Sequence, residues 1–278
     1  MGYKRLLDLP SKSDTFEFNV PDSWVAFVWE SLNEFGAHRI LKEFVADPPE
    51  YIVGDNLSWL DRTIYRATSE YVDSKVWFLE KFKSQYSCVR CFHGTRTDQV
   101  NQFYLEGLLA LNSASARENI LRIFSDAGCD EITEVIVDKA MSEVGLETRE
   151  NRVYFNFGEE FYPEEFGHYL LYGGEFICAV AAHFPGARDY RQCLKKIGLP
   201  TLFVCDVPIA MISEYQLLGL AGSCLSIAFQ MKTYGEDFCF DNERDFSVSI
   251  ATNLPPSAIK GHYHPTNIRD PFSSIGRL

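Results

Sequence analysis

Apolar residues recur at helical spacing in the first third of the chain. A Pro-Asp-Ser helix-start signal stands at residues 21–23, and the two prolines at 48–49 end the element that follows. A second periodic stretch covers residues 57–82. We therefore expect residues 1–85 to form a helical N-terminal region whose aromatic side chains pack in a core. The apolar positions of its first helix are Trp24, Phe27, Val28, Leu32, Phe35 and Ile40.

The pattern changes after residue 86, where short apolar runs predict strands. These runs are residues 87–93, 152–157, 201–207 and 246–251. Helical patterns separate them, at residues 116–127, 131–144 and 164–183. The stretch 217–231 stays ambiguous, because Gly219 and Gly222 weaken a helix. We expect an α+β domain over residues 86–278 with a helical insertion at 112–150.

Composition excludes some classes of protein. The chain has 278 residues, 46% hydrophobic and 14% aromatic, which favours a folded chain with a large core. Its net charge of −13 gives no general attraction to nucleic acid or to an anionic membrane, and no run of about 18 apolar residues predicts a membrane span.

Cysteine usage bears on location and on metals. Eight thinly spread cysteines fit reduced thiols in a cytoplasmic protein better than a disulfide framework. Cys88 and Cys91 form a C-x-x-C, but no second pair follows at zinc spacing, so we expect no metal.

The most informative stretch is CFHGTRTDQVNQFYLEGLL at residues 91–109, in which His-Gly ends an apolar run and a short helix follows. Taken alone, it fits an ordinary strand-turn-helix corner. Later come VYF at 153–155, an aromatic helix, the strand TLFVCDV, and an acidic strand followed by LPPSAI. In this order the motifs resemble the ADP-ribosyltransferase superfamily, in its poly(ADP-ribose)-polymerase-like and diphtheria-toxin-like branch. The resemblance covers about residues 86–265 and implies a split β-sheet core.

The resemblance implies roles for the first motif. His93 matches the histidine that hydrogen-bonds the adenosine-side ribose of NAD. Gly94 matches the glycine whose backbone holds the nicotinamide carboxamide, where a flat ligand pressed on backbone leaves no room for a Cβ. Thr95 and Arg96 complete the motif and are expected to contact NAD with it.

Aromatic residues are expected at the nicotinamide ring. Tyr154 matches the second motif residue, beside the ring. A second aromatic from the following helix stacks on the other face in the family, and Tyr162 and Tyr169 both qualify. We favour Tyr169, because it lies within the helical run.

The third motif position departs from the family, which usually has a glutamate there that bonds the nicotinamide ribose. Alternation along residues 246–251 places no glutamate inside the strand, because its two faces carry the apolar Phe246, Val248 and Ile250 and the polar Ser247 and Ser249. Glu243 has the right side chain one step early, Asp245 has the right place with a shorter reach, and Glu236 is more remote. Glu243 also fits a solvated charge in an acidic turn. Because no glutamate stands inside the strand, a weakened or inactive enzyme is an alternative.

The resemblance implies an ADP-ribosyltransferase that uses NAD as a substrate, similar to intracellular toxins and defence effectors, and hence a neutralising partner protein. NAD hydrolysis and a catalytically inactive module that binds NAD or a partner are the alternatives. We expect a macromolecular acceptor, with protein slightly favoured over RNA or DNA by the net charge. Six basic residues could instead gather as a groove for nucleic acid: Arg39, Lys42, Lys81, Lys83, Arg90 and Arg96.

Overall fold

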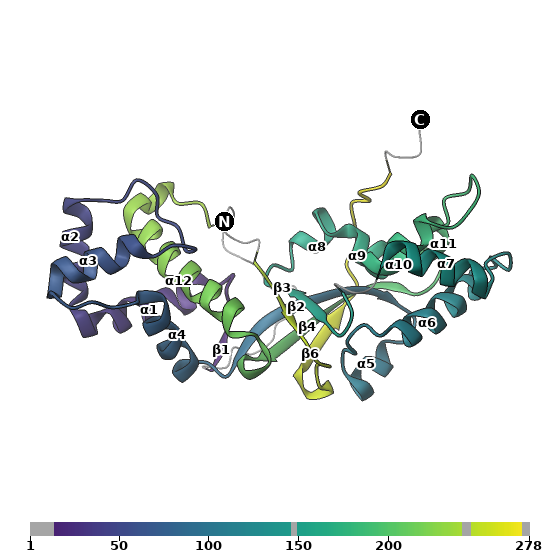
Figure 1. Ribbon diagram of the computed structural model, residues 1–278, viewed down its shortest axis with the longest axis horizontal. Coiled ribbons are helices and arrows are strands. Elements are labelled where there is room, and N and C mark those ends of the chain that lie inside the picture. Colours follow the sequence, from purple (N-terminus) through teal and green to yellow (C-terminus); the bar gives the residue numbers. More distant parts are fainter. Residues whose placement is uncertain (1–13, 146–148, 241–245, 274–278) are drawn as a thin grey trace. The chain divides into compact units, whose positions relative to one another are not determined.

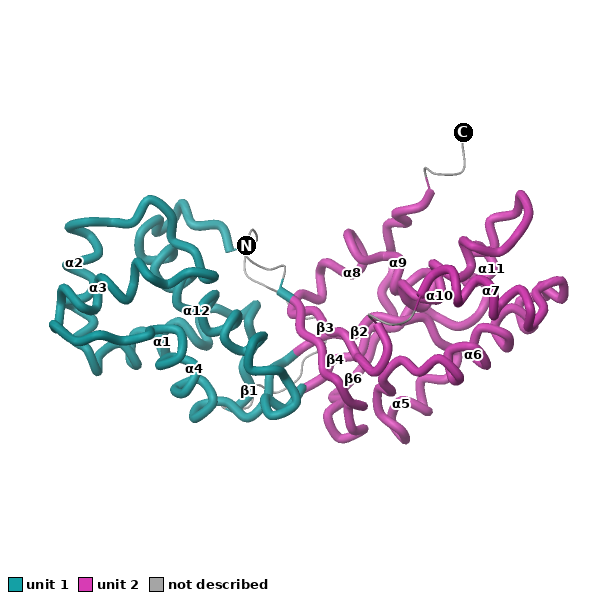
Figure 2. Tube along the Cα trace, viewed as in Figure 1, with its two compact units in different colours: residues 1–4, 10–90, 207–246 teal, residues 5–9, 91–206, 247–278 magenta. Residues whose placement is uncertain are grey.

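The computed structural model describes residues 14–145, 149–240 and 246–273. It is an α+β protein, as the alternation of strand and helix patterns predicts, and its sheet has six strands, two more than the four expected. The chain divides into two compact units, drawn in teal and magenta in Figure 2. Within the described residues, the first contains 14–90, 207–240 and 246, and the second contains 91–145, 149–206 and 247–273.

The first unit consists mainly of helices (Figure 1). Its α-helices are α1 (Val25–Leu32), α2 (Ala37–Ala46), α3 (Ser58–Thr68), α4 (Ser74–Gln85) and α12 (Glu214–Tyr234). Short 3₁₀ turns accompany them: η1 (Pro21–Ser23), η2 (Asn33–Phe35), η3 (Ile209–Met211) and η4 (Gly235–Asp237). The two-residue strand β1 (Thr15–Phe16) pairs in parallel with the start of β2 (Cys88–Thr97). The expected helical character of the N-terminal region is therefore present.

Helix α12 resolves the ambiguous stretch at 217–231 and changes the expected domain boundary. The helix continues through Gly222, and the backbone of Gly54 passes close to this position. A Cβ on Gly222 would lie 2.2 Å from the Gly54 carbonyl oxygen. The glycine thus permits close packing of two segments of the first unit. Residues 207–240 and 246 belong to that unit, whereas the sequence pattern assigned them to a domain starting at residue 86.

The second unit carries most of the sheet, whose strand order is β5-β3-β2-β4-β6. The strands are β2, β3 (Val153–Asn156), β4 (Leu199–Pro208), β5 (Ser247–Ile250) and β6 (Ile259–Tyr263). The helices are α5 (Val100–Glu106), α6 (Ser113–Asp126), α7 (Glu134–Val144), α8 (Phe161–Glu164), α9 (Gly167–Tyr172), α10 (Glu175–Ala182) and α11 (Arg191–Leu194), with a 3₁₀ turn η6 (Pro256–Ala258). The four strands expected from the sequence all form, with slightly different ends.

Helices pack on both faces of β4. Successive side chains of a strand point to opposite faces, and those of β4 are buried on both. Leu202 and Val204 on one face share a core cluster with Phe92 of β2 and with residues of α8 and α9. Phe203 on the opposite face contacts Phe103 of α5, with ring centroids 4.7 Å apart. The sheet is therefore covered by α8 and α9 on one side and by α5 on the other.

The expected helical insertion forms α6 and α7, which build a second core with α10 and α11 (Figure 1). The helical run expected over 164–183 is divided at Gly173 and Gly174, whose φ angles of 88° and 144° end one helix before the next begins. None of the helices in the described ranges is long and apolar enough to cross a membrane.

Candidate functional site

The structure brings the histidine and tyrosine motifs onto adjacent strands. His93 lies on β2 and Tyr154 on β3, and the two strands are antiparallel with Phe92 paired to Asn156. His93 Nδ1 lies 2.9 Å from the Tyr154 carbonyl oxygen. Because a carbonyl only accepts, Nδ1 carries the proton and donates it, which leaves Nε2 as an acceptor. Burial lowers the pKa of His93, although its hydrogen bond to the Tyr154 backbone opposes this.

The two side chains nevertheless lie on opposite faces of the sheet. Continuing the register from Phe92 and Asn156 places His93 opposite Phe155, and the ring centroids of these two residues are 5.9 Å apart. Alternation then directs the Tyr154 phenol to the other face, where it is 46% exposed. His93 therefore meets β3 through the Phe155 ring and the Tyr154 carbonyl, and not through the Tyr154 phenol.

Gly94 provides a close approach for an aromatic ring. A Cβ at this position would lie 2.4 Å from Cε1 and 2.5 Å from Cδ1 of Tyr162. The Tyr162 hydroxyl donates to the Phe92 carbonyl at 2.8 Å, and the Gly94 backbone hydrogen-bonds the same phenol oxygen. Burial raises the pKa of Tyr162, so the phenol stays protonated and can donate. A glycine is needed here because any larger residue would displace this ring.

Tyr162 and Tyr169 form an aromatic group beside Gly94 with their ring centroids 6.2 Å apart. Tyr162 is almost fully buried, whereas Tyr169 is only partly buried, and burial raises the pKa of Tyr169. The sequence favours Tyr169 as the second aromatic of the site, but the ring in contact with Gly94 belongs to Tyr162. The three tyrosines share one face of the sheet.

Thr95 and Arg96 hold distant segments of backbone. The Thr95 hydroxyl donates to the Gly173 carbonyl at 3.2 Å, and Arg96 Nε donates to the Ile197 carbonyl at 2.8 Å. Arg96 Nη2 donates to the Lys195 carbonyl. Burial lowers the pKa of Arg96. These contacts give both residues a structural task, and their contact with NAD stays a prediction.

Of the three carboxylates expected near the third motif position, only Glu236 lies within the described residues. Glu243 and Asp245 lie outside the described residues, and Glu236 is exposed in η4 of the first unit. On β5, Ser249 pairs with Tyr154. The expected alternation of β5 is present, since Val248 and Ile250 are buried in the apolar core.

One buried carboxylate was not singled out by the sequence. Glu159 is 3% exposed, and its Oε2 accepts a hydrogen bond from the Tyr263 hydroxyl at 2.9 Å. It precedes α8, and its backbone carbonyl accepts from the Tyr162 amide at 3.3 Å. Its only signal in the sequence is an acidic pair three residues beyond a strand, which is the usual pattern of an exposed turn.

A segment that follows β6, residues 268–270, contacts α8 and α9 and holds them in position. The Arg269 amide donates to the Pro163 carbonyl at 2.8 Å, and a Cβ on Gly167 would lie 2.1 Å from the Arg269 carbonyl oxygen. Asp270 accepts from the Tyr172 hydroxyl at 2.8 Å and pairs with Lys195 at 2.5 Å. We call residues 268–270 the clamp segment. It fixes the two helices that carry Tyr162 and Tyr169.

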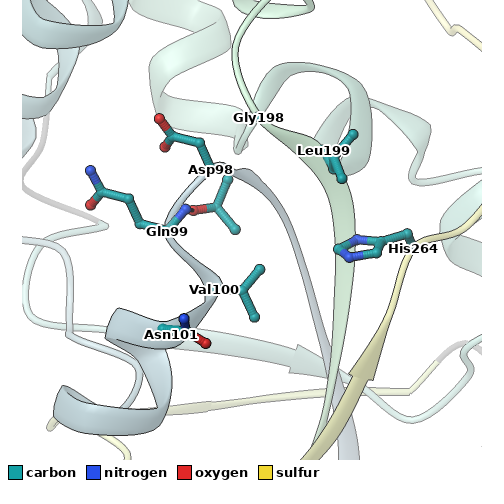
Figure 3. Close-up of a pocket in the computed structure, with 8 residues that line it drawn as sticks. Asp98, Gln99, Val100, Asn101, Gly198, Leu199 and His264 are labelled. Atoms are coloured by element: carbon teal, nitrogen blue, oxygen red, sulfur yellow. Dashed lines mark hydrogen bonds between the residues drawn. The ribbon is translucent and has the colours of Figure 1, made fainter.

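A pocket of about 490 Å³ lies at the C-terminal end of β2 (Figure 3), and its lining does not include His93, Gly94, Tyr154 or Tyr162. Gly198 at the pocket wall has a φ of 70°, and its close approach to the Thr97 backbone excludes a side chain there. His264 Nδ1 donates to the Pro200 carbonyl at 2.9 Å at the pocket wall. The pocket is lined by Thr97, Asp98, Gln99, Val100, Asn101, Gly198, Leu199 and His264, none of which the sequence singled out as a site residue.

The described part of the chain contains no group of three or more His, Cys, Asp or Glu side chains that could hold a metal ion. Cys88 and Cys91 are three residues apart on β2, so their side chains point to opposite faces and cannot chelate together. No family model matches the chain, and comparison with curated proteins and with solved structures finds no match.

Proposed function

We propose that the chain is an ADP-ribosyltransferase of the poly(ADP-ribose)-polymerase-like and diphtheria-toxin-like type, acting on NAD and a macromolecular acceptor. The observation that carries the proposal is the adjacency of His93 and Gly94 on β2 to Tyr154 on β3, with an aromatic ring against Gly94. These residues are about 60 positions apart in the sequence and their strands adjoin, although the side chains of His93 and Tyr154 lie on opposite faces of the sheet.

In this proposal Tyr162 marks the place of the nicotinamide. Its phenol is a flat ring with one polar group, and it hydrogen-bonds the backbone of Phe92 and Gly94. A nicotinamide carboxamide offers a donor and an acceptor to the same backbone groups. Binding then requires the Tyr162 ring to turn away, after which it can stack on the nicotinamide with Tyr154 or Tyr169.

The reaction breaks the bond between nicotinamide and ribose, with nicotinamide as the leaving group and an acceptor oxygen or nitrogen as the nucleophile. Positive charge develops on the ribose, so a carboxylate beside it stabilises the transition state more than the ground state. Glu243 and Asp245 are the proposed carboxylates, and Glu159 is a third candidate because it is buried and lies three residues before Tyr162 in the chain.

A non-catalytic binding module is the second candidate. Two observations favour it: the Gly94 backbone is already bonded to Tyr162, and the β5 residue paired with Tyr154 is Ser249. A domain with these features could bind a partner or NAD without turning it over.

Incubation with NAD labelled in the adenosine moiety and a cell extract tests the proposal. Transfer predicts label on a macromolecule and release of nicotinamide. Digestion with protease or with nuclease then identifies the acceptor class, for which protein is slightly favoured by the net charge of −13. Label running only as free ADP-ribose would indicate hydrolysis, and unchanged NAD would favour the binding module.

The carboxylate is assigned by comparing three conservative variants, Glu159→Gln, Glu243→Gln and Asp245→Asn. The variant at the true position should lose turnover while NAD affinity changes less, because the contact matters most as charge develops. Glu236→Gln is the matched control, since Glu236 is exposed in the first unit. The assignment fails if all four variants keep the activity of the parent.

A further inference from the structure

Two buried cysteines of the second unit meet although they are 64 residues apart in the chain. The Sγ atoms of Cys129 and Cys193 are 2.9 Å apart, and each residue is 1% exposed. Cys129 follows α6 in the turn toward α7, and Cys193 lies within α11. The contact between their sulfur atoms therefore lies between the helical insertion and the segment that leads into β4.

A guanidinium group contacts both sulfur atoms. Arg188 Nη2 lies 3.1 Å from the Cys193 sulfur and 3.5 Å from the Cys129 sulfur. Arg188 is held in this position by Glu131, 2.7 Å from its Nη1, and by the Tyr190 ring, whose centroid is 5.0 Å from the guanidinium carbon. A fixed positive charge beside a thiol favours the thiolate, which is the reactive form.

From this arrangement we propose that Cys129 and Cys193 form a reversible disulfide when the protein meets a peroxide. One thiolate attacks the peroxide oxygen, which gives a sulfenic acid and, with hydrogen peroxide, releases hydroxide that takes up a proton to form water. The second thiol then attacks that sulfur and expels a second water. In sum, two thiols and hydrogen peroxide give one disulfide and two waters, and a dithiol reductant restores both thiols by exchange.

The local geometry distinguishes this pair from other cysteines of the chain. Cys178 belongs to the same core cluster, where burial raises its pKa to about 11, and Cys239 is exposed in the first unit. Neither shares the contact of two sulfur atoms with one guanidinium that Cys129 and Cys193 have. They serve as internal standards for buried and exposed thiols.

The disulfide would act on the segment that holds the candidate site. Cys193 is followed by Lys195 and Ile197, whose carbonyls accept hydrogen bonds from Arg96 on β2. Oxidation fixes this segment to the turn after α6, and reduction releases it. The link gives the redox state of the pair a direct structural route to β2.

Burial and charge act in opposite directions on the rate of oxidation. Desolvation raises the pKa of Cys129 to about 11, and the charge of Arg188 opposes the rise. Only a small fraction is thiolate at neutral pH, so the rate should rise about tenfold for each unit of increase in pH, as long as the pH stays below that pKa. Arg188→Gln removes the positive charge and should slow disulfide formation by about tenfold, the equivalent of one pKa unit.

The test treats the intact protein with hydrogen peroxide, blocks free thiols with an alkylating agent under denaturing conditions, and maps peptides by mass spectrometry. We expect a peptide pair linked through Cys129 and Cys193 that disappears on reduction with dithiothreitol. Cys178→Ala should form the same link, whereas Cys193→Ser should not.

Recovery of Cys129 and Cys193 as alkylated thiols, in a sample whose exposed Cys239 is oxidised, would overturn the proposal. So would a linked peptide that joins Cys178 to either residue, or equal rates for the parent and Arg188→Gln. Each readout is thiol chemistry and needs no transfer of ADP-ribose, so failure here and failure of the proposed function are separate results.

Discussion

Gly94→Ala should destabilise the second unit through a single contact. The added Cβ would lie 2.4 Å from Cε1 and 2.5 Å from Cδ1 of Tyr162, closer than Cβ atoms are found, while Leu170 Cδ2 at 3.5 Å is an ordinary contact. The obstacle is the body of a buried ring whose hydroxyl is bonded at 2.8 Å to the Phe92 carbonyl. Overpacking of this kind costs about 1–3 kcal/mol.

A double-mutant cycle isolates this contact. Tyr162→Ala alone should cost about 3–5 kcal/mol, the range for removing a large buried aromatic side chain. In that background the ring is gone, and Gly94→Ala should cost almost nothing. The two substitutions should therefore show a favourable coupling of about 1–3 kcal/mol, well above the error of additive sites.

The assay is urea denaturation followed by far-ultraviolet circular dichroism. Tryptophan fluorescence provides an internal comparison, because all four tryptophans lie in the first unit, at positions 24, 29, 59 and 77. A cost for Gly94→Ala below about 0.5 kcal/mol, or an equal cost with and without the Tyr162 ring, would refute the packing argument. The same contact means that Gly94→Val also displaces Tyr162, so loss of NAD binding in that variant is no test of the pocket without this cycle.

Four further outcomes are expected. Tyr162→Phe should lose about 1 kcal/mol in urea denaturation, the usual net value of one buried hydrogen bond, and unchanged stability would show that the bond to the Phe92 carbonyl contributes nothing. The folded-state pKa of His93 is below the ordinary 6.5, so the unfolded state binds more protons near pH 6.5 and the free energy of unfolding should fall as the pH drops through this value. His93→Gln should flatten this dependence of stability on pH. Identical pH profiles for the parent and the variant would contradict a neutral His93 ring in the folded state. Oxidation of the cysteine pair closes a loop of 64 residues and should raise the free energy of unfolding by about 4 kcal/mol, visible as a higher midpoint that a reductant reverses; an unchanged midpoint in the linked form would contradict this. Glu243→Gln or Asp245→Asn should lower the rate of nicotinamide release more than NAD affinity in a titration, and a loss confined to affinity would indicate a binding role instead.

The strand pattern could be predicted from the sequence because it depends on local alternation. The polar Ser247 and Ser249 and the apolar Val248 and Ile250 occupy opposite faces of β5, as their period of two indicates. The helical insertion could also be predicted from the sequence, because α6 and α7 have apolar stripes that are buried in one core. These features confirm the α+β class, for which no long-range information is needed.

Features that depend on contacts between residues far apart in the chain could not be predicted from the sequence. The turn expected at His-Gly-Thr-Arg is absent, because β2 continues to Thr97, held by the bonds of Thr95 and Arg96 to carbonyls about 80 to 100 residues away. Gly222 weakens a helix locally but is required by the approach of Gly54. A single sequence carries the propensity of each glycine but not the segment that packs against it.

The ring at Gly94 shows the same limit within the candidate site. Tyr162 and Tyr169 have equal chemistry, and the choice between them rested on membership of a helical run. Tyr162 lies instead in the one-turn helix α8, and its position is set by the bond to Phe92 and by the packing of Leu170. The strands that carry the first two motifs, β2 and β3, are neighbours in the sheet, whereas the choice of side chains at the site required the tertiary structure.

The clamp segment also has a consequence for the time course of synthesis. Pro163 and Gly167 leave the ribosome roughly one hundred residues before Arg269, whose amide donates to the Pro163 carbonyl and whose carbonyl lies against Gly167. Until then the Tyr172 hydroxyl lacks Asp270, and Lys195 lacks the same carboxylate. The contacts that fix α8 and α9 are therefore completed late in synthesis, so a chain stalled before residue 268 would hold β2 and β3 but lack the contacts of the clamp segment.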